Sequence, residues 1–366
     1  MILTYKYRVK NANAKSALRR HAYAVNQVWN YCCAQQRDTE SRYRAGAPKR
    51  KWASHYDLQR LCKGAGAMLG IHQQTIGGVC RAFAQARDKA KHAPTFRKSY
   101  GVRRSSGWIP FECQSRQIKD GVVTYLGKRF YLWGLKRRPI PTTVKGGAFV
   151  EDALGRWYVC LTVEVERKPA TSDKAVGIDL GLKSLAALSD GRKIEAPQIY
   201  RRYEQQLAAL QRAGKRRHAK RLHAKIKACR ADFLHKVSTE LAGQNAIIAV
   251  GNVNASALAS KSVLDAGWSS FRKMLAYKAN DYREVDERFT TQDCSACGAR
   301  CGPKGQKGLG IRAWECSSCG ESHDRDVNAA RNILALALSA ERPVEEYRES
   351  GMIQDLAPLG VNRIST

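Results

Sequence analysis

Two Cys-x-x-Cys pairs near the C-terminus constrain the fold of this chain more than any other feature. Such a pair presents two sulfurs on one tight turn, and two pairs together close a tetrahedral four-thiolate zinc site with no open position. We therefore expect residues 291–321 to form a ribbon around a structural zinc ion. His323 is an alternative ligand, and four free buried thiols are the alternative to a metal. The expected ligands are Cys294, Cys297, Cys316 and Cys319.

The remaining cysteines are scattered, Cys301 among them, and we expect them to pack in the core. Residues 1–10 lack the compact apolar block and cleavage site of a secretory signal. The longest apolar runs, such as residues 333–338, are far shorter than the roughly 18 residues that a membrane span needs. We expect a cytoplasmic protein with no membrane partner, in which thiols are metal ligands or core residues rather than disulfides.

The charge of the chain predicts a polyanionic partner. Lys and Arg number 64 against 32 Asp and Glu, so the net charge is +32. Residues 1–150 carry 30 basic and 6 acidic residues, and residues 201–230 carry 11 basic residues and one acid. We expect both regions to bind phosphates, with a solvated helix face as the alternative for the second. The expected nucleic-acid-binding residues are Arg201, Arg202, Arg212, Lys215, Arg216, Arg217, Lys220 and Arg221.

The hydrophobic period of the N-terminal half changes along the chain. A strand-like alternation is followed by helical segments and then by period-two segments again. This order predicts a small β-barrel with helices inserted after its first strand. The expected strands are residues 2–9, 108–113, 122–125, 129–133 and 157–165, and the expected helices are residues 14–44, 54–62 and 71–91.

Beyond a linker at residues 168–174 the order of elements becomes βββ-α-β-α-β-α, which is that of a ribonuclease H-like domain. We expect a final flexible tail at residues 341–366. The expected elements are strands at residues 175–180, 185–188, near Lys193, 246–250 and 283–289, and helices at residues 203–242, 263–279 and from Val327. The expected core stripe of the long helix is Leu222, Ile226, Cys229, Phe233, Val237 and Leu241.

Two acidic positions are candidate metal ligands. Asp179 ends a buried strand, where a carboxylate is costly unless a metal or a hydrogen bond compensates its charge. Asp324 and Asp326 stand at the start of the last helix. There a carboxylate satisfies free amides and the helix dipole whatever the function, so capping is the alternative to catalysis.

Four segments of the chain are informative when they are considered together. They are Gly-Ile-Asp-Leu-Gly-Leu-Lys-Ser-Leu-Ala at 177–186, Asp-Ala-Gly-Trp-Ser-Ser-Phe-Arg-Lys-Met-Leu-Ala-Tyr-Lys at 265–278, Thr-Thr-Gln-Asp-Cys-Ser-Ala-Cys-Gly at 290–298 and Asp-Arg-Asp-Val-Asn-Ala-Ala-Arg-Asn-Ile at 324–333. Together they resemble the TnpB family of transposon-encoded RNA-guided nucleases, which are ancestral to type V CRISPR effectors.

The resemblance implies an α+β multidomain fold. It implies an N-terminal wedge-like β-barrel with an inserted helical recognition lobe, and a C-terminal RuvC nuclease domain interrupted by a zinc-bearing target-strand-loading insert. The implied bounds are residues 1–12 and 93–170 for the barrel, 13–92 for the lobe, 171–290 and 322–340 for RuvC, and 291–321 for the insert.

The resemblance also implies three carboxylates that hold magnesium, and two of them map to Asp179 and Asp326. The third is usually a Glu just after the fourth strand, where this chain has Gly251. Glu287, at the end of the neighbouring expected strand, is the predicted replacement, because adjacent strands are only about 4.8 Å apart. Glu284, Asp286 and a dead site are the alternatives.

The implied function is that of an RNA-guided DNA endonuclease that cleaves target DNA beside a short adjacent motif. Its partners would be a guide RNA and a target DNA, and its cofactors a structural zinc and catalytic magnesium. Its place would be the prokaryotic cytoplasm, at the nucleoid. The alternative, favoured by Gly251, is a nuclease-dead RNA-guided DNA-binding protein that acts as a repressor or roadblock. A transposase proper has no recognisable residue set beyond these acids.

Overall fold

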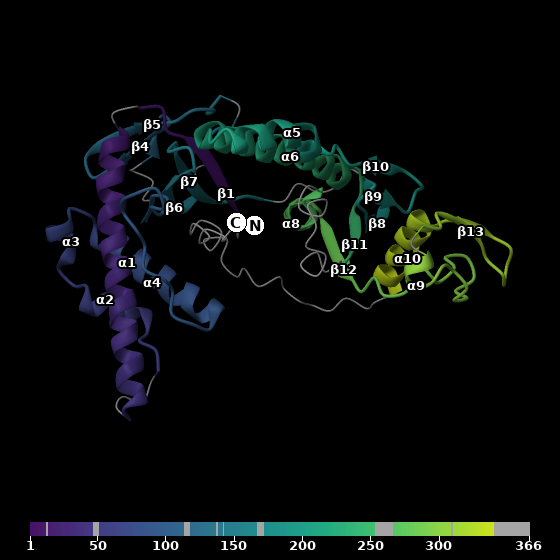
Figure 1. Ribbon diagram of the computed structural model, residues 1–366, viewed down its shortest axis with the longest axis horizontal. Coiled ribbons are helices and arrows are strands. Elements are labelled where there is room, and N and C mark those ends of the chain that lie inside the picture. The colour runs from purple at the N-terminus through teal and green to yellow at the C-terminus, as the bar shows by residue number, and fades with distance from the viewer. Residues whose placement is uncertain are drawn as a thin grey trace. The chain divides into compact units, whose positions relative to one another are not determined.

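The computed structural model of the chain (Figure 1) describes residues 1–11, 14–46, 51–112, 118–136, 138–141, 143–166, 172–252, 266–308 and 310–339. The expected tail and Asp265 lie outside the described residues. The described residues divide into two compact units, one up to Glu166 and the other from Ser172, and each has its own hydrophobic core. No helix in these ranges is long and apolar enough to cross a membrane.

The strands of the N-terminal unit form two antiparallel sheets, one ordered β1-β7-β6-β2 and the other β3-β4-β5. A bridge between Val9 and Leu132 links them, while closure into a barrel stays a prediction. The strands are β1 (Ile2–Arg8), β2 (Trp108–Phe111), β3 (Ile118–Lys119), β4 (Val122–Tyr125), β5 (Lys128–Tyr131), β6 (Val144–Glu151) and β7 (Trp157–Glu164). The sequence missed β6 because Gly146 and Gly147 interrupt its apolar pattern. A Cβ at Gly147 would lie 2.7 Å from the carbonyl oxygen of Cys160.

Helices follow β1, as the sequence predicted, and three of the four in the described residues match the expected ones. They are α1 (Ala14–Arg44), α2 (His55–Leu61), α3 (Ala65–Leu69) and α4 (Gln73–Ala90). The short α3 was not expected, since glycines surround it. Ser54 and Asp57 form a capping box at the start of α2. The helices share one core with the sheets, in which the ring of Trp29 meets that of Phe83 with centroids 5.3 Å apart.

The C-terminal unit is built on one five-stranded sheet of order β10-β9-β8-β11-β12. Strand β9 pairs antiparallel with both β8 and β10, whereas β11 runs parallel to β8 and β12 runs parallel to β11. The strands are β8 (Ala175–Leu180), β9 (Ser184–Leu188), β10 (Lys193–Glu195), β11 (Ile247–Gly251) and β12 (Asp281–Val285). The five strands occur along the chain in the order expected from the sequence, with two helices instead of one between β10 and β11.

The expectation of a single long helix at residues 203–242 is wrong, because this region forms two helices. They are α5 (Ile199–Arg212) and α6 (Arg216–Gln244), which pack side by side (Figure 1). Gly214 between them has φ of 63°, a left-handed conformation that ends a helix. Cys229 is exposed and is not part of the core stripe. It lies on α6 between the part that packs against α5 and the part that packs in the core of the sheet.

The remaining elements are α8 (Trp268–Lys278), α9 (Gly305–Gly308), β13 (Ala313–Glu315), β14 (Ser322–Asp324) and α10 (Arg325–Ser339). Helix α10 packs directly on β8, since a Cβ at Gly177 would collide with the carbonyl oxygen of Ala330. Asn328 and Asn332, one turn apart, donate to the carbonyl oxygens of Thr290 and Asp293. The Asn-Ala-Ala-Arg-Asn segment therefore presses α10 onto the sheet and ties it to the start of the cysteine-rich insert.

Candidate active site and cysteine centre

Asp179 and Gly251 lie at the same end of two neighbouring strands. Val250 of β11 pairs with Ile178 of β8, so Gly251 and Asp179 are each one residue further along parallel strands. The indole nitrogen of Trp268 donates to the carbonyl oxygen of Gly181 at 3.2 Å, which ties the turn after Asp179 to α8. This hydrogen bond holds the turn that follows the end of β8 against α8.

The carboxylate of Glu287 lies over Gly251. A Cβ built at Gly251 would be 2.7 Å from Oε2 of Glu287 and 3.2 Å from its Cβ. The strand expected at residues 283–289 ends at Val285, and Phe289 has φ of 66°, so Glu287 stands in the bend after the strand. The acid therefore occupies the space that a side chain at residue 251 would fill.

The two alternative acids do not share this position. Glu284 is exposed, accepts a hydrogen bond from the Tyr282 hydroxyl at 2.7 Å and lies 4.0 Å from Arg272. Asp286 is exposed and accepts from the backbone amide of Arg288 at 3.0 Å. Of the three candidates, Glu287 is the one that faces the end of β11.

Asp324 and Asp326 have different surroundings at the start of α10. Oδ1 of Asp324 accepts from the amides of Asp326 and Val327, both at 3.1 Å, and its Oδ2 accepts from Nζ of Lys193 at 2.7 Å. Partial burial opposes the ionised form, but the bonds from Lys193 and these amides bring the pKa of Asp324 below its usual value. Asp324 is thus a helix cap, as the alternative interpretation proposed for this position.

Asp326 points to a second cation. Nη1 of Arg312, just before β13, lies 2.9 Å and 3.2 Å from its two carboxylate oxygens, and Nζ of Lys193 lies 3.9 Å away. The sequence did not single out Arg312 or Lys193. A cation in a basic chain carries no signal of its own, and only the fold brings these two to α10.

The charges of the two other acids act on Asp179. Burial, followed by the charges of Asp326 and Glu287, raises the pKa of Asp179 to about 8, and burial raises that of Glu287. Within the described ranges, the groups whose donor atoms lie within 4.8 Å of one another are made of cysteines, so the three carboxylates do not converge that tightly. Carboxylate oxygens are the ligands that magnesium prefers, and a bound cation would offset the negative charges around Asp179.

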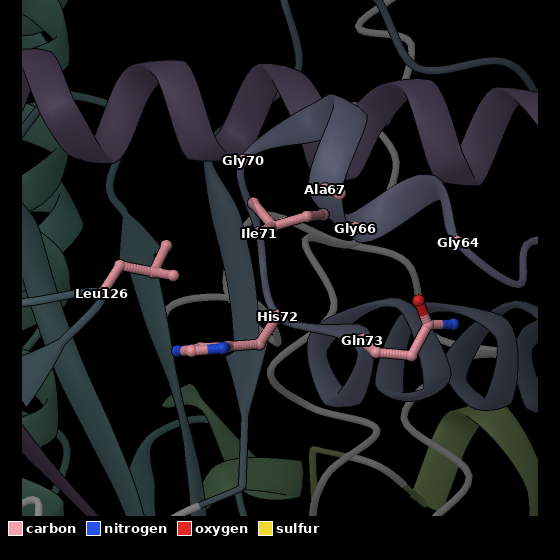
Figure 2. A pocket seen from close by; sticks show the side chains of 8 residues that line it. All are labelled: Gly64, Gly66, Ala67, Gly70, Ile71, His72, Gln73 and Leu126. Atoms are coloured by element: carbon pink, nitrogen blue, oxygen red, sulfur yellow. The ribbon is translucent and has the colours of Figure 1, made fainter.

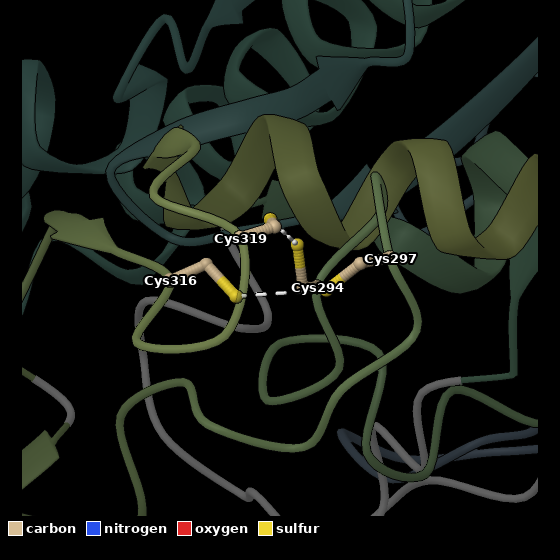
Figure 3. Close-up of side chains that lie close together, drawn as sticks. All are labelled: Cys294, Cys297, Cys316 and Cys319. Carbon is tan, nitrogen blue, oxygen red and sulfur yellow. Dashed lines mark hydrogen bonds between the residues drawn. The ribbon is translucent and has the colours of Figure 1, made fainter.

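The four predicted cysteines converge on one point (Figure 3), with all sulfurs within 4.8 Å of one another. The Sγ atoms of Cys294 and Cys319 are 3.7 Å apart, and so are those of Cys297 and Cys316. Sulfurs about 2.3 Å from one zinc ion at tetrahedral corners are separated by about 3.8 Å. The cluster therefore fits a zinc ion.

Two further groups stand beside this cluster. Sγ of Cys301 is 3.1 Å from Sγ of Cys316, so the expectation that Cys301 packs in the core is wrong. The amide of Gly302 donates to the carbonyl oxygen of Gln292, which holds the loop of Cys301 beside the residues that precede the first pair. Nε2 of the buried His323 is 3.0 Å from Sγ of Cys294, where an imidazole N–H can donate to a ligand sulfur.

The predicted phosphate-binding residues lie on α5, on α6 and in the turn between them. All eight are exposed: Arg201, Arg202, Arg212, Lys215, Arg216, Arg217, Lys220 and Arg221. The apolar sides of the two helices pack on each other through Leu207, Leu222 and Ile226. The basic side chains are therefore left free to meet a polyanion.

A groove of about 450 Å³ lies in the N-terminal unit between α3, the start of α4 and Leu126 (Figure 2). Its lining is mostly glycine and apolar, and His72 is its one titratable side chain. These residues supply neither a carboxylate nor a thiolate. We assign the groove no catalytic role.

Comparison with known proteins places the chain among transposon-related proteins. The Cas12f1-like TNB domain model matches residues 268–333, and the OrfB_IS605 model, "Probable transposase", matches residues 158–262. A Streptomyces pristinaespiralis protein named "Putative RNA-guided DNA endonuclease" is 39% identical over 241 residues, 58% of this chain and 58% of that protein, so less than two thirds of its length is spanned. Residues 158–262 and 268–333 are thus similar to the TnpB/IS605 transposase family and its Cas12f1-like relatives.

Other relatives cover more of the chain. The Escherichia coli (strain K12) "Putative RNA-guided DNA endonuclease InsQ" is 26% identical over 363 residues, 87% of this chain and 88% of that protein. Among solved structures, the Cas12f1 chain of a complex with single-guide RNA and target DNA is 15% identical, with a TM-score of 0.35 over 91% of this chain and 99% of that chain.

Proposed function

We propose that the chain is an RNA-guided DNA endonuclease that cuts at the carboxylates around the end of β8. The observation that carries the proposal is Glu287, whose carboxylate fills the place of the missing side chain at Gly251. The position usually occupied by an acid would thus still have one, supplied by the segment that follows β12. The names of the Streptomyces and Escherichia coli relatives support the same reaction.

The sheet supports a ribonuclease H-like, RuvC-type nuclease domain. Three antiparallel strands followed by two parallel ones, with β8 in the centre, support this assignment, and residues 171–290 and 322–340 would form this domain. Residues 291–321 would be the zinc ribbon that loads the target strand. Residues 1–12 and 93–170 would form the wedge-like barrel, and residues 13–92 the recognition lobe.

Asp179, Glu287 and Asp326 would hold magnesium. When bound, magnesium activates water and stabilises the leaving oxygen of a phosphodiester. The chain's own residues would set the geometry. Asp324, held by Lys193, fixes the first turn of α10 and with it the backbone of Asp326.

A guide RNA and a target DNA would be the polyanions that the chain binds. The exposed basic side chains of α5 and α6 and the excess of 30 basic over 6 acidic residues in residues 1–150 support this. Base pairing would carry sequence specificity, while the protein would bind the phosphates and read a short adjacent motif.

The test begins with the RNA that copurifies when the chain is expressed with its own genomic flank. That RNA is reprogrammed against a plasmid, and magnesium-dependent conversion from supercoiled to linear DNA is measured. We expect Glu287→Ala to abolish cleavage to the same extent as Asp179→Ala and Asp326→Ala, with target binding by gel shift intact. The matched control is Asp286→Ala, which should cleave normally. Full cleavage by Glu287→Ala would remove Glu287 from the site.

The second candidate is a nuclease-dead, RNA-guided DNA-binding protein, and Gly251 is the observation that favours it. It predicts that the wild-type chain binds its guided target and blocks transcription but shows no magnesium-dependent cleavage. The same plasmid assay separates the two functions, because the wild type alone decides between them.

A further inference from the structure

A second cluster of thiols lies in the N-terminal unit, among the helices that follow β1. Cys32 lies in α1, Cys62 follows α2 as its C-cap, and Cys80 lies in α4. Their sulfurs are within 4.8 Å of one another, and Sγ of Cys32 is 3.9 Å from Sγ of Cys80. Cys32 and Cys80 have no exposed surface and Cys62 has 4%. Three separate helices thus bring one sulfur each to a single buried point.

The distance between the sulfurs of Cys32 and Cys80 is that of two ligands of one ion. Sulfurs about 2.3 Å from a common metal are about 3.8 Å apart in a tetrahedral site and about 4.0 Å apart in a trigonal one. The 3.9 Å between Cys32 and Cys80 falls between these values. Within the described parts of the chain no fourth Cys, His, Asp or Glu joins the group. Thiolate ligands select soft, thiophilic cations.

We propose that Cys32, Cys62 and Cys80 bind a thiophilic d¹⁰ cation, zinc(II) or copper(I), in a site separate from the cysteine ribbon. Each thiol releases its proton as its sulfur binds the ion, so no oxidation takes place. Three thiolates around zinc(II) carry one net negative charge. The excess of basic residues in residues 1–150, 30 against 6 acidic, offsets that charge.

The ion would fasten a segment that has few other anchors. Within residues 51–72 the buried side chains are Leu58, Cys62 and Ile71. Helix α2 has 7 residues and α3 has 5, and helices of this length are not stable by themselves. A metal at the end of α2 would tie it to α1 and α4 at once, as structural metals do in small domains.

Cys33 provides a matched control. It is next to Cys32 and also fully buried, but its Sγ points to the carbonyl oxygen of Pro94 at 3.5 Å and is not part of the cluster. If the thiols served only as small apolar groups, Cys33→Ser and Cys62→Ser would have the same effect on metal content, namely none.

The test is the metal content of the full-length chain, purified with reductant under nitrogen and loaded with zinc or with copper(I). Native mass spectrometry and inductively coupled plasma mass spectrometry count the ions. We expect two thiophilic ions per wild-type chain and per Cys33→Ser chain, and one in Cys62→Ser and in Cys297→Ser. The wild-type count keeps the proposal testable even where Cys62→Ser fails to fold.

One ion per wild-type chain after both loadings would overturn the proposal, and so would two ions in Cys62→Ser. A mass lower by about two protons, with a disulfide between Cys32 and Cys80 in peptide maps of the purified chain, would overturn it as well, because those sulfurs would then be bonded to each other.

Discussion

Gly251→Ala tests whether the carboxylate of Glu287 has to lie where it does. The added Cβ would be 2.7 Å from Oε2 of Glu287, and ordinary contact begins at 3.4 Å, so the carboxylate must retreat by about 0.7 Å (3.4 less 2.7). A displacement of about 1 Å at a reacting group costs about 10²-fold in rate. We expect single-turnover cleavage to fall about 10- to 100-fold, or about 1.4 to 2.7 kcal/mol in the activation free energy.

The fold should tolerate this change. The displaced atom is the end of a flexible side chain, and the two other neighbours, Cβ of Glu287 and Cδ1 of Ile333, are each 3.2 Å away and need to yield by only a few tenths of an ångström. We therefore expect the melting temperature to shift by a few degrees at most and target binding to stay unchanged. Cleavage by Gly251→Ala should also require more magnesium for half-maximal rate. Gly243→Ala, on α6 with nothing within 4 Å of its Cβ, should cleave as the wild type does.

Wild-type cleavage by Gly251→Ala at every magnesium concentration would refute this reasoning. The carboxylate would then be able to act from another position, and the close approach of Glu287 to Gly251 would have no part in catalysis. Loss of target binding together with cleavage would refute it differently, because the substitution would then have disturbed the sheet.

Three further predictions follow from the C-terminal unit. Gly177→Ala should prevent soluble expression or lower the melting temperature strongly, since its Cβ would collide with the backbone of α10; a melting curve like that of the wild type would contradict this. In the metal-free chain, folded Asp179 keeps its proton to about pH 8 whereas an unfolded Asp loses it near pH 4, so its contribution to stability falls as pH rises across this window. Asp179→Asn removes this dependence on pH. We therefore expect the free energy of unfolding of the variant minus that of the wild type, measured in urea, to be larger at pH 8 than at pH 4 by roughly 1 kcal/mol or more. Equal pH profiles of the two proteins would contradict this. Arg216→Gln with Arg217→Gln should weaken guide-RNA binding and reduce the slope of log K against log salt by about two, which filter binding at several salt concentrations measures.

The elements that the sequence predicted well are those whose period is uninterrupted. Helix α1 carries its apolar positions over 31 residues, and its bounds agree with the expected ones. Strand β6 and the break at Gly214 were missed because glycine gives no apolar signal, and its effect depends on the backbone conformation and neighbours that the fold imposes. The expected position of Glu287 rested on strand spacing, although β12 ends two residues before it.

Arg312 and Lys193 show why part of the site could not be found in the sequence. Lys193 lies in β10 and Arg312 in the cysteine-rich insert, more than a hundred residues apart in the sequence. Lys193 contacts Asp324 and Arg312 contacts Asp326, the two acids at the start of α10. Asp326 contacts Arg312 on both oxygens, so the insert that the four cysteines fold also governs the charge around a proposed magnesium ligand. A cation that binds these acids must compete with that guanidinium. The cysteine-rich insert and the carboxylates are therefore linked through one ion pair, and loss of the cysteine centre should alter cleavage even where every acid is intact.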